Sequence, residues 1–195
     1  MRGLAIAFGL LCGVVLLCIP APVLAQDQPA ADIGGGYSFI RDYRVEENLP
    51  LGWFASGAYN ITDWLAAVGE IGGSYKSDDF TVDSDTFSTN TRLHTFLGGA
   101  RHSRRLKGTT PFAQVLVGVA RETGGVTIFR QSIATPQTKL ALQPGGGIDI
   151  PVTDRISARL AADYRRIFAR RENTEERDNH EVRFAVGLVV GFGSR

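Results

Sequence analysis

The last long apolar stretch of the chain, EVRFAVGLVVGF at residues 181–192, alternates apolar side chains with charged or small ones. One face carries Val182, Phe184, Val186, Leu188, Val190 and Phe192, and the other carries Arg183, Ala185, Gly187, Val189 and Gly191. Successive side chains of a β-strand point to opposite faces, so a period of two is the signature of a strand. The stretch therefore predicts a strand with one apolar face and one face of charged and small residues.

Seven earlier stretches show the same alternation, and turn-forming residues separate them. No long helical periodicity occurs between them, so the fold class predicted for the chain is all-β with eight strands. The predicted strands are 32–40, 50–60, 64–76, 91–102, 110–121, 138–150, 155–166 and 181–192.

The connections between these strands alternate strictly between long and short. The short ones are 60–63, 103–109 and 151–154, and the long, polar ones are 41–49, 77–90, 122–137 and 167–180. In an up-and-down antiparallel barrel, this order gathers all long loops at one rim and all short turns at the other. Transmembrane barrels of the bacterial outer membrane have long loops outside and short turns in the periplasm. We therefore expect an eight-stranded transmembrane barrel with periplasmic termini.

Residues 1–25 differ from the rest and match a secretory signal peptide. Arg2 supplies the positive charge, residues 4–17 form an apolar segment that is short for a membrane span, and Ala25 precedes the expected cleavage site. Residues 26–195 then form the barrel domain. Both cysteines, Cys12 and Cys18, lie in the leader, so the exported domain has no disulfide. Its 20 basic and 20 acidic residues balance after loss of Arg2, which argues against a nucleic-acid binder.

The glycines bear on which face of the sheet lines the interior. A soluble barrel with its apolar face inward, like a lipocalin, shows the same alternation. Glycine weakens a strand unless something approaches closely, and a narrow polar lumen needs that space. Ten strand glycines fall on the charge-bearing faces and six on the apolar faces, which favours the membrane barrel. The ten are Gly34, Gly36, Gly52, Gly72, Gly98, Gly118, Gly145, Gly147, Gly187 and Gly191.

Aromatic residues on the apolar faces support the same polarity. They lie mostly near strand ends, as in the aromatic girdles of membrane barrels: Tyr37, Trp53, Tyr59, Tyr75, Tyr164 and Phe192. Arg101 is an exception, because alternation places it on the apolar face. At the periplasmic end of its strand, its stem can lie along the wall while the charge reaches water.

The chain resembles the OmpA/OmpX-like superfamily of small outer-membrane β-barrels over nearly all of residues 31–192. The resemblance rests on the order and spacing of the segments 35–39, 95–101, 110–113 and 145–150, the last continuing to 161–165. It implies an outer-membrane location, no enzymatic activity, and recognition by periplasmic chaperones and the barrel-assembly machinery. The family usually ends in an aromatic residue, whereas here Gly193-Ser194-Arg195 follows Phe192.

An eight-stranded barrel is wide enough only for its own side chains, so we expect a closed lumen. The predicted lumen network is structural and comprises Glu70, Asp149, Arg159, Asp163, Arg165, Glu181 and Arg183. We expect no catalytic, cofactor-binding or metal-binding residues, and a monomer surrounded by outer-membrane lipid. Arg170 and Arg171, in the last long loop, are candidates for contact with lipopolysaccharide phosphates.

Two alternative functions remain open, and the first is a lipid-modifying outer-membrane enzyme. His102-Ser103 bears a faint similarity to the residues of lipid A deacylases, although alternation points both His102 and His94 inward, whereas His180 borders an outer loop. No calcium site is expected in the acidic segment 78–85, because it lacks the glycine and the terminal glutamate of an EF-hand loop; this favours a solvated loop. The other alternative is a soluble periplasmic barrel that binds an apolar ligand.

Overall fold

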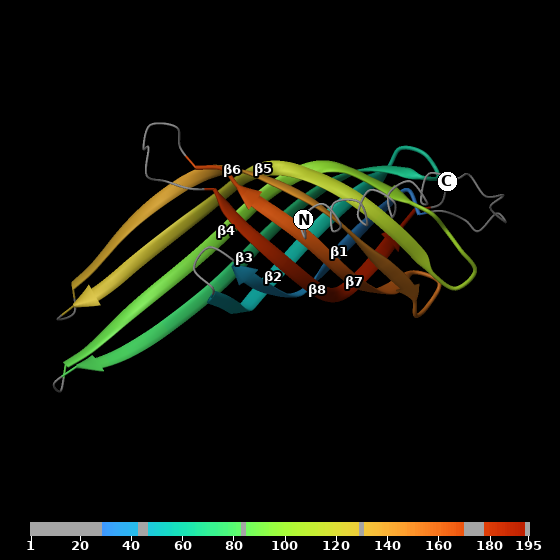
Figure 1. Cartoon of the computed structure of the whole chain (residues 1–195). Helices are drawn as coiled ribbons and strands as arrows, with labels where there is room; N and C mark the ends of the chain where they lie inside the picture. The colour runs from blue at the N-terminus through green and yellow to red at the C-terminus, as the bar shows by residue number, and fades with distance from the viewer. Residues whose placement is uncertain (1–28, 43–46, 83–84, 129–130, 170–177, 194–195) are drawn as a thin grey trace, which may run out of the picture.

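A computed structural model describes residues 29–42, 47–82, 85–128, 131–169 and 178–193. Eight antiparallel strands form one closed barrel in which every strand pairs with its sequence neighbour and β1 pairs with β8 (Figure 1). The predicted architecture is confirmed. The strands are β1 (Ala31–Asp42), β2 (Glu47–Asn60), β3 (Leu65–Val82), β4 (Asp85–Ser103), β5 (Thr110–Ile128), β6 (Gln131–Pro151), β7 (Ile156–Ile167) and β8 (Asn179–Phe192).

The predicted signal peptide lies outside the described residues. Within the described ranges, no helix is long and apolar enough to cross a membrane.

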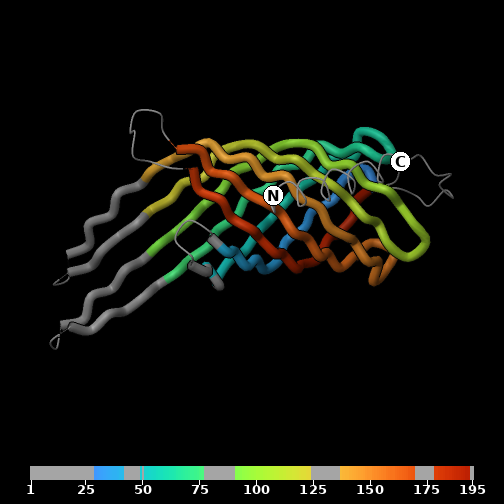
Figure 2. The backbone as a smooth tube through the Cα atoms, in the orientation of Figure 1, coloured from blue at the N-terminus to red at the C-terminus, as the bar shows by residue number. Residues whose placement is uncertain are grey.

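The barrel has two different rims. Short connections at 61–64, 104–109 and 152–155 gather at one end, which we call the short-turn rim; β1 and β8 also meet there, where Ala31 pairs with Phe192. At the opposite end, the long-hairpin rim, β3–β4 and β5–β6 run on past the other strands (Figure 1), whereas the backbone tube of Figure 2 shows the short turns together at the first end. Residues 77–90 and 122–137, predicted as loops, mostly belong to these hairpins, in which Val82 pairs with Asp85 and Ile128 with Gln131. Threonine and valine occur in both segments and favour strands. The prediction of loops followed the polarity of the segments and gave too little weight to these residues.

Threonine hydroxyls shape two of the short turns in the same way. Thr62 Oγ1 accepts a hydrogen bond from the backbone N–H of Leu65, and Thr153 Oγ1 accepts one from that of Ile156, both at 3.0 Å. Side-chain oxygens that bond nearby backbone in this manner favour tight turns. The similarity between the segments 61–64 and 152–155 therefore reflects turn chemistry.

The polarity of the barrel wall is that of a membrane protein. Large apolar side chains face outward and are exposed all around the wall, among them Ile33, Leu51, Ile71, Phe96, Val117, Leu140, Leu160 and Leu188. The six girdle aromatics also face outward, and Tyr37, Trp53, Tyr59, Tyr164 and Phe192 are exposed. Charged and small residues face inward on β7 and β8, where Arg159, Asp163 and Arg183 are buried.

The lumen is not purely polar. Buried apolar residues form a cluster inside the barrel, which includes Ile40, Leu49, Val68, Leu93, Leu97, Leu116 and Ile167. Side chains of both kinds thus fill the narrow interior.

The facing predicted for β4 was wrong by one residue. Leu93, Thr95, Leu97 and Arg101 are buried in the lumen, whereas Phe96 is exposed on the outside. His94 and His102 therefore share the outward face, and Gly98 and Gly99 exchange sides. The error arose because β4 has leucines inside as well as a phenylalanine outside, so its alternation does not identify the apolar wall.

A polar network through the barrel lumen

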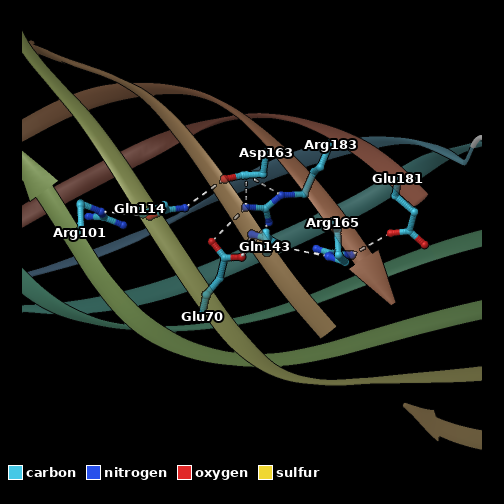
Figure 3. A network of polar contacts seen from close by, with 8 residues as sticks. All are labelled: Glu70, Arg101, Gln114, Gln143, Asp163, Arg165, Glu181 and Arg183. Atoms are coloured by element: carbon cyan, nitrogen blue, oxygen red, sulfur yellow. Dashed lines mark hydrogen bonds and ion pairs between the residues drawn. The ribbon is translucent and has the colours of Figure 1, made fainter. Parts of the chain in front are cut away.

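Arg183 on β8 is the centre of a buried charge cluster (Figure 3). Its guanidinium lies 2.9 Å from the Glu70 carboxylate of β3 and 2.6 Å from the Asp163 carboxylate of β7. All three side chains are 4 % exposed or less. The Phe54 ring of β2 also lies against the guanidinium, 5.5 Å from centroid to Cζ. One cation thus serves two carboxylates, and it links β3 to β8 across the barrel.

A second ion pair lies toward the long-hairpin rim. Arg165 NH1 lies 3.3 Å from Glu181 Oε2, and Asn179 donates a hydrogen bond of 3.2 Å to the other oxygen of Glu181. Gln143 on β6 joins this pair to the central cluster: its amide oxygen accepts from Arg165 Nε at 2.8 Å, and its amide nitrogen donates to Glu70 at 3.1 Å. Gln143 and Arg165 are fully or almost fully buried.

Toward the short-turn rim, Arg101 and Gln114 extend the network. Gln114 donates to Asp163 at 3.2 Å and accepts from Arg101 Nε at 3.2 Å. Arg101 NH1 also lies 3.7 Å from Asp32 of β1. The prediction that Arg101 faces the lipid is therefore wrong, because the charge finds an acid and an amide inside the barrel instead of water outside.

Asp149 and Arg159 form a separate bidentate pair close to the same end. Arg159 Nε and NH2 each donate to the Asp149 carboxylate at 2.7 Å. The ring of Phe112 lies 4.8 Å from the Arg159 guanidinium and 4.9 Å from that of Arg101. An aromatic face attracts cations, so Phe112 stabilises two arginines whose like charges repel each other.

All seven residues of the predicted network face the lumen; five of them belong to one connected network, and Asp149 and Arg159 form a pair of their own. Glu70, Asp163 and Arg183 form one cluster, and Gln143 links it to Arg165 and Glu181. Gln114, Gln143 and Asn179 also belong to the network, and the charge pattern of the sequence does not indicate them because their amides are neutral. With these amides, the network of hydrogen bonds and ion pairs is continuous from Asn179 near one rim to Asp32 near the other.

The charged groups of the lumen have one another as partners. Within the described residues, no group of three or more His, Cys, Asp and Glu side chains is arranged to hold a metal ion. The buried arginines Arg159, Arg165 and Arg183 each form an ion pair with at least one carboxylate.

The histidines lie on the outer wall, where sequence analysis did not expect His94 and His102. The His102 ring lies beside Trp64 at the short-turn rim, with centroids 5.6 Å apart, and its Nδ1 has no hydrogen-bond partner among the described residues. His94 Nε2 lies 3.2 Å from the hydroxyl of Tyr75, and His180 contacts the hydroxyl of Tyr164. No described carboxylate orients the His102 ring, as a catalytic histidine would require. Arg170 and Arg171 lie outside the described residues.

Asp178 directly precedes β8 at the long-hairpin rim, and its hydrogen bonds can be tested by a pH titration. It accepts hydrogen bonds from the backbone N–H of Ala169 and from Arg166 Nε, both at 2.9 Å, and these bonds lower the pKa of its carboxyl, the backbone bond most. A lowered folded-state pKa stabilises this hairpin end above the ordinary aspartate pKa of about 3.9, and the stabilisation is lost as the pH falls through the lowered value.

We expect the NMR signal of the Ala169 amide to shift as micelle samples are titrated from pH 5 to pH 2. Asp178→Asn keeps an acceptor oxygen and removes the titration, so the shift should vanish in that variant. An unchanged titration in Asp178→Asn would assign it to another group.

The fold and its interior together define a class of protein. A closed eight-stranded barrel with an exposed apolar wall, aromatic girdles and buried charges is a transmembrane barrel of the outer-membrane type. The sequence profile of the family described as "Outer membrane protein beta-barrel domain" matches residues 10–189. The chain belongs to this family and is an outer-membrane protein. No curated protein matches it.

Solved structures of small outer-membrane barrels share the fold. Ail of Yersinia pestis, crystallised with the heparin analogue sucrose octasulfate, aligns with a TM-score of 0.61 and 16% identity, over 85% of this chain and 99% of Ail. OprG of Pseudomonas aeruginosa aligns with a TM-score of 0.55 and 10% identity, over 89% of this chain and 100% of OprG. Neisserial surface protein A aligns with a TM-score of 0.54 and 13% identity, over 83% of this chain and 96% of the neisserial protein. The similarity at these identities is one of fold.

Proposed function

We propose that this protein is a non-catalytic barrel with a closed lumen, which acts through its presence in the membrane and through the surface of its long-hairpin rim. The observation that carries the proposal is the buried polar chain from Asn179 to Asp32, which fills the barrel from one rim toward the other. A polar vestibule of about 850 Å³ opens at the short-turn rim and is lined by Asp32, Arg105, Asp149 and Arg155. Asp32 and Asp149 in its lining are the ion-pair partners of Arg101 and Arg159, so the vestibule ends at the edge of the lumen network.

The orientation follows from the unequal rims. Outer-membrane barrels place short turns in the periplasm and long connections outside, so the hairpins β3–β4 and β5–β6 form the extracellular surface of the protein. The protein acts as a monomer, inserted by the barrel-assembly machinery. A protease added to intact cells should then cut within these hairpins and leave the short-turn rim intact.

Conductance in planar lipid bilayers tests the closed lumen. We expect the purified barrel to insert without producing discrete current steps, because the paired charges leave no continuous path for hydrated ions. A reproducible single-channel conductance in the unmodified protein would contradict the proposal. Insertion is checked in parallel by the change in gel mobility on heating that folded membrane barrels show.

A lipid hydrolysis assay tests the non-catalytic part. We expect no release of fatty acids from lipopolysaccharide or phospholipid. Release that is abolished by His102→Ala would establish the enzymatic alternative.

A further inference from the structure

The outer wall of β4 and β5 changes abruptly from apolar to basic on the way to the long-hairpin rim. Phe96, Val115, Val117 and Val119 face outward and are exposed, as a lipid-facing wall requires. The next outward positions are His94 on β4 and Arg121 on β5, followed by Arg92. The two arginines are exposed. Charges this close to the end of an apolar band lie at the level of lipid headgroups.

The strand register brings these basic residues together. His94 pairs with Arg121 across β4 and β5, and Arg92 pairs with Tyr75 across β3 and β4. Side chains at directly opposed positions on one face have Cβ atoms about 4.5–5.5 Å apart. Tyr75, Arg92, His94 and Arg121 thus form one outward patch, which we call the basic patch. No described carboxylate forms an ion pair with either arginine of this patch.

Hydrogen bonds and a ring contact hold the His94 side chain in place. Trp53 Nε1 donates to the Tyr75 hydroxyl at 3.3 Å, and that hydroxyl lies 3.2 Å from His94 Nε2. In the tautomer in which Nε2 accepts the hydroxyl proton, Nδ1 of the imidazole carries a proton that Tyr75 does not use. The Tyr75 and His94 rings meet edge to face at 5.6 Å, which fixes the imidazole further.

We propose that the basic patch binds phosphate groups of lipopolysaccharide in the outer leaflet. Guanidinium groups bind phosphate oxygens in a bidentate manner, and an imidazole N–H adds a third donor. The apolar wall directly below, at Phe96 and Val119, accommodates the acyl chains that a phosphorylated lipid carries. The inference rests on the orientation proposed above, which places this rim outside, where lipopolysaccharide forms the leaflet.

Another outward arginine near the same rim provides the contrast. Arg166 on β7 also faces outward, but Asp178 accepts hydrogen bonds from it and the Phe168 ring lies 5.1 Å from its guanidinium. Its charge is already neutralised by the protein. Arg166→Gln is therefore the matched control for loss of an outward arginine at this level.

The test measures lipid-dependent stabilisation of protein that has been purified in detergent and freed of lipopolysaccharide. The readout is the temperature at which the folded band disappears on a gel, followed against the concentration of added lipopolysaccharide. We expect the midpoint to rise for the unmodified protein and for Arg166→Gln. In the double variant Arg92→Gln/Arg121→Gln the half-saturating concentration should rise at least tenfold, because a hydrogen bond between charged groups commonly contributes that much to affinity. Without lipid, all three proteins should have the same midpoint, since the substituted side chains are exposed.

Two further arms of the test identify the source of the phosphate and need no variant. Lipopolysaccharide stripped of its lipid A phosphates should stabilise the unmodified protein much less, and micelles of phosphatidylglycerol should not replace the intact lipid. Equal stabilisation by the dephosphorylated lipid, or by phosphatidylglycerol, would overturn the proposal, as would a double variant with unchanged half-saturation. These outcomes are independent of the conductance measurement, so the closed lumen and the lipid site can fail separately.

Discussion

Replacing Arg183 by methionine is expected to destabilise the barrel by about 3–5 kcal/mol. The substitution removes the cation that lies 2.9 Å from Glu70 and 2.6 Å from Asp163 and leaves two like charges buried together. Desolvated charges without a partner cost far more than the net gain from the intact pair. Urea unfolding of the protein in lipid vesicles, followed by the fluorescence of Trp53 and Trp64, measures the loss of stability.

The control for this prediction is an arginine whose ion pair is partly exposed. Arg166→Met breaks the ion pair with Asp178, in which the Arg166 side chain is 46% exposed and the Asp178 side chain 26% exposed. The free energy of unfolding should fall by less than about 1 kcal/mol. The triple variant Arg183→Met/Glu70→Gln/Asp163→Asn should recover much of the loss, because the charges that were left unpaired are gone. If Arg183→Met were as mild as Arg166→Met, the central cluster would not hold the barrel together.

The sequence predicted the barrel well where one wall is plainly apolar. On β7 and β8, the outward positions are mostly apolar and the inward ones are mostly charged or small, so the facing of Asp163 and Arg183 was evident from alternation. The strict order of long and short connections then required an up-and-down topology. Both signals are local, and local signals are what a single sequence contains.

The facing of β4 could not be predicted with the same rule. Leu93 and Leu97 face a lumen that is partly apolar, while His94 and His102 face outward. A barrel this narrow must be filled by side chains, and apolar ones fill it as well as paired charges do. Alternation identifies two faces, but it identifies the inner one only if that face is the more polar.

The sequence also could not predict which residues pair with each other across the lumen. Glu70 and Arg183 are 113 positions apart, and the residues that connect their cluster to the rest are the neutral glutamines Gln143 and Gln114. Nothing in the local pattern distinguishes these glutamines from others. Their role depends on the stagger of the strands, which sets which inward residues lie at the same height.

The seam that closes the barrel should be intolerant of any side chain at Gly36. Gly36 on β1 pairs with Gly187 on β8, and a Cβ at Gly36 would lie 2.1 Å from the Val186 carbonyl oxygen and 2.5 Å from the Gly187 Cα. Both atoms belong to the backbone, so the clash cannot be relieved by rotating a side chain. Because β1–β8 is the last pairing along the chain and the one that abolishes the open edges, separating the strands here exposes unpaired backbone groups to lipid.

Gly36→Val is therefore expected to leave most of the protein unfolded in a refolding assay, measured as the fraction of the folded band on unheated gels. Gly57→Val is the matched control, because Gly57 also pairs with a glycine, Gly69, yet a Cβ at either would meet nothing within 4 Å. An outward valine there adds apolar surface facing lipid and should leave folding intact. Equal folding of the two variants would mean that the β1–β8 strands can separate enough to admit a side chain, and that the closure of the barrel does not depend on the two facing glycines.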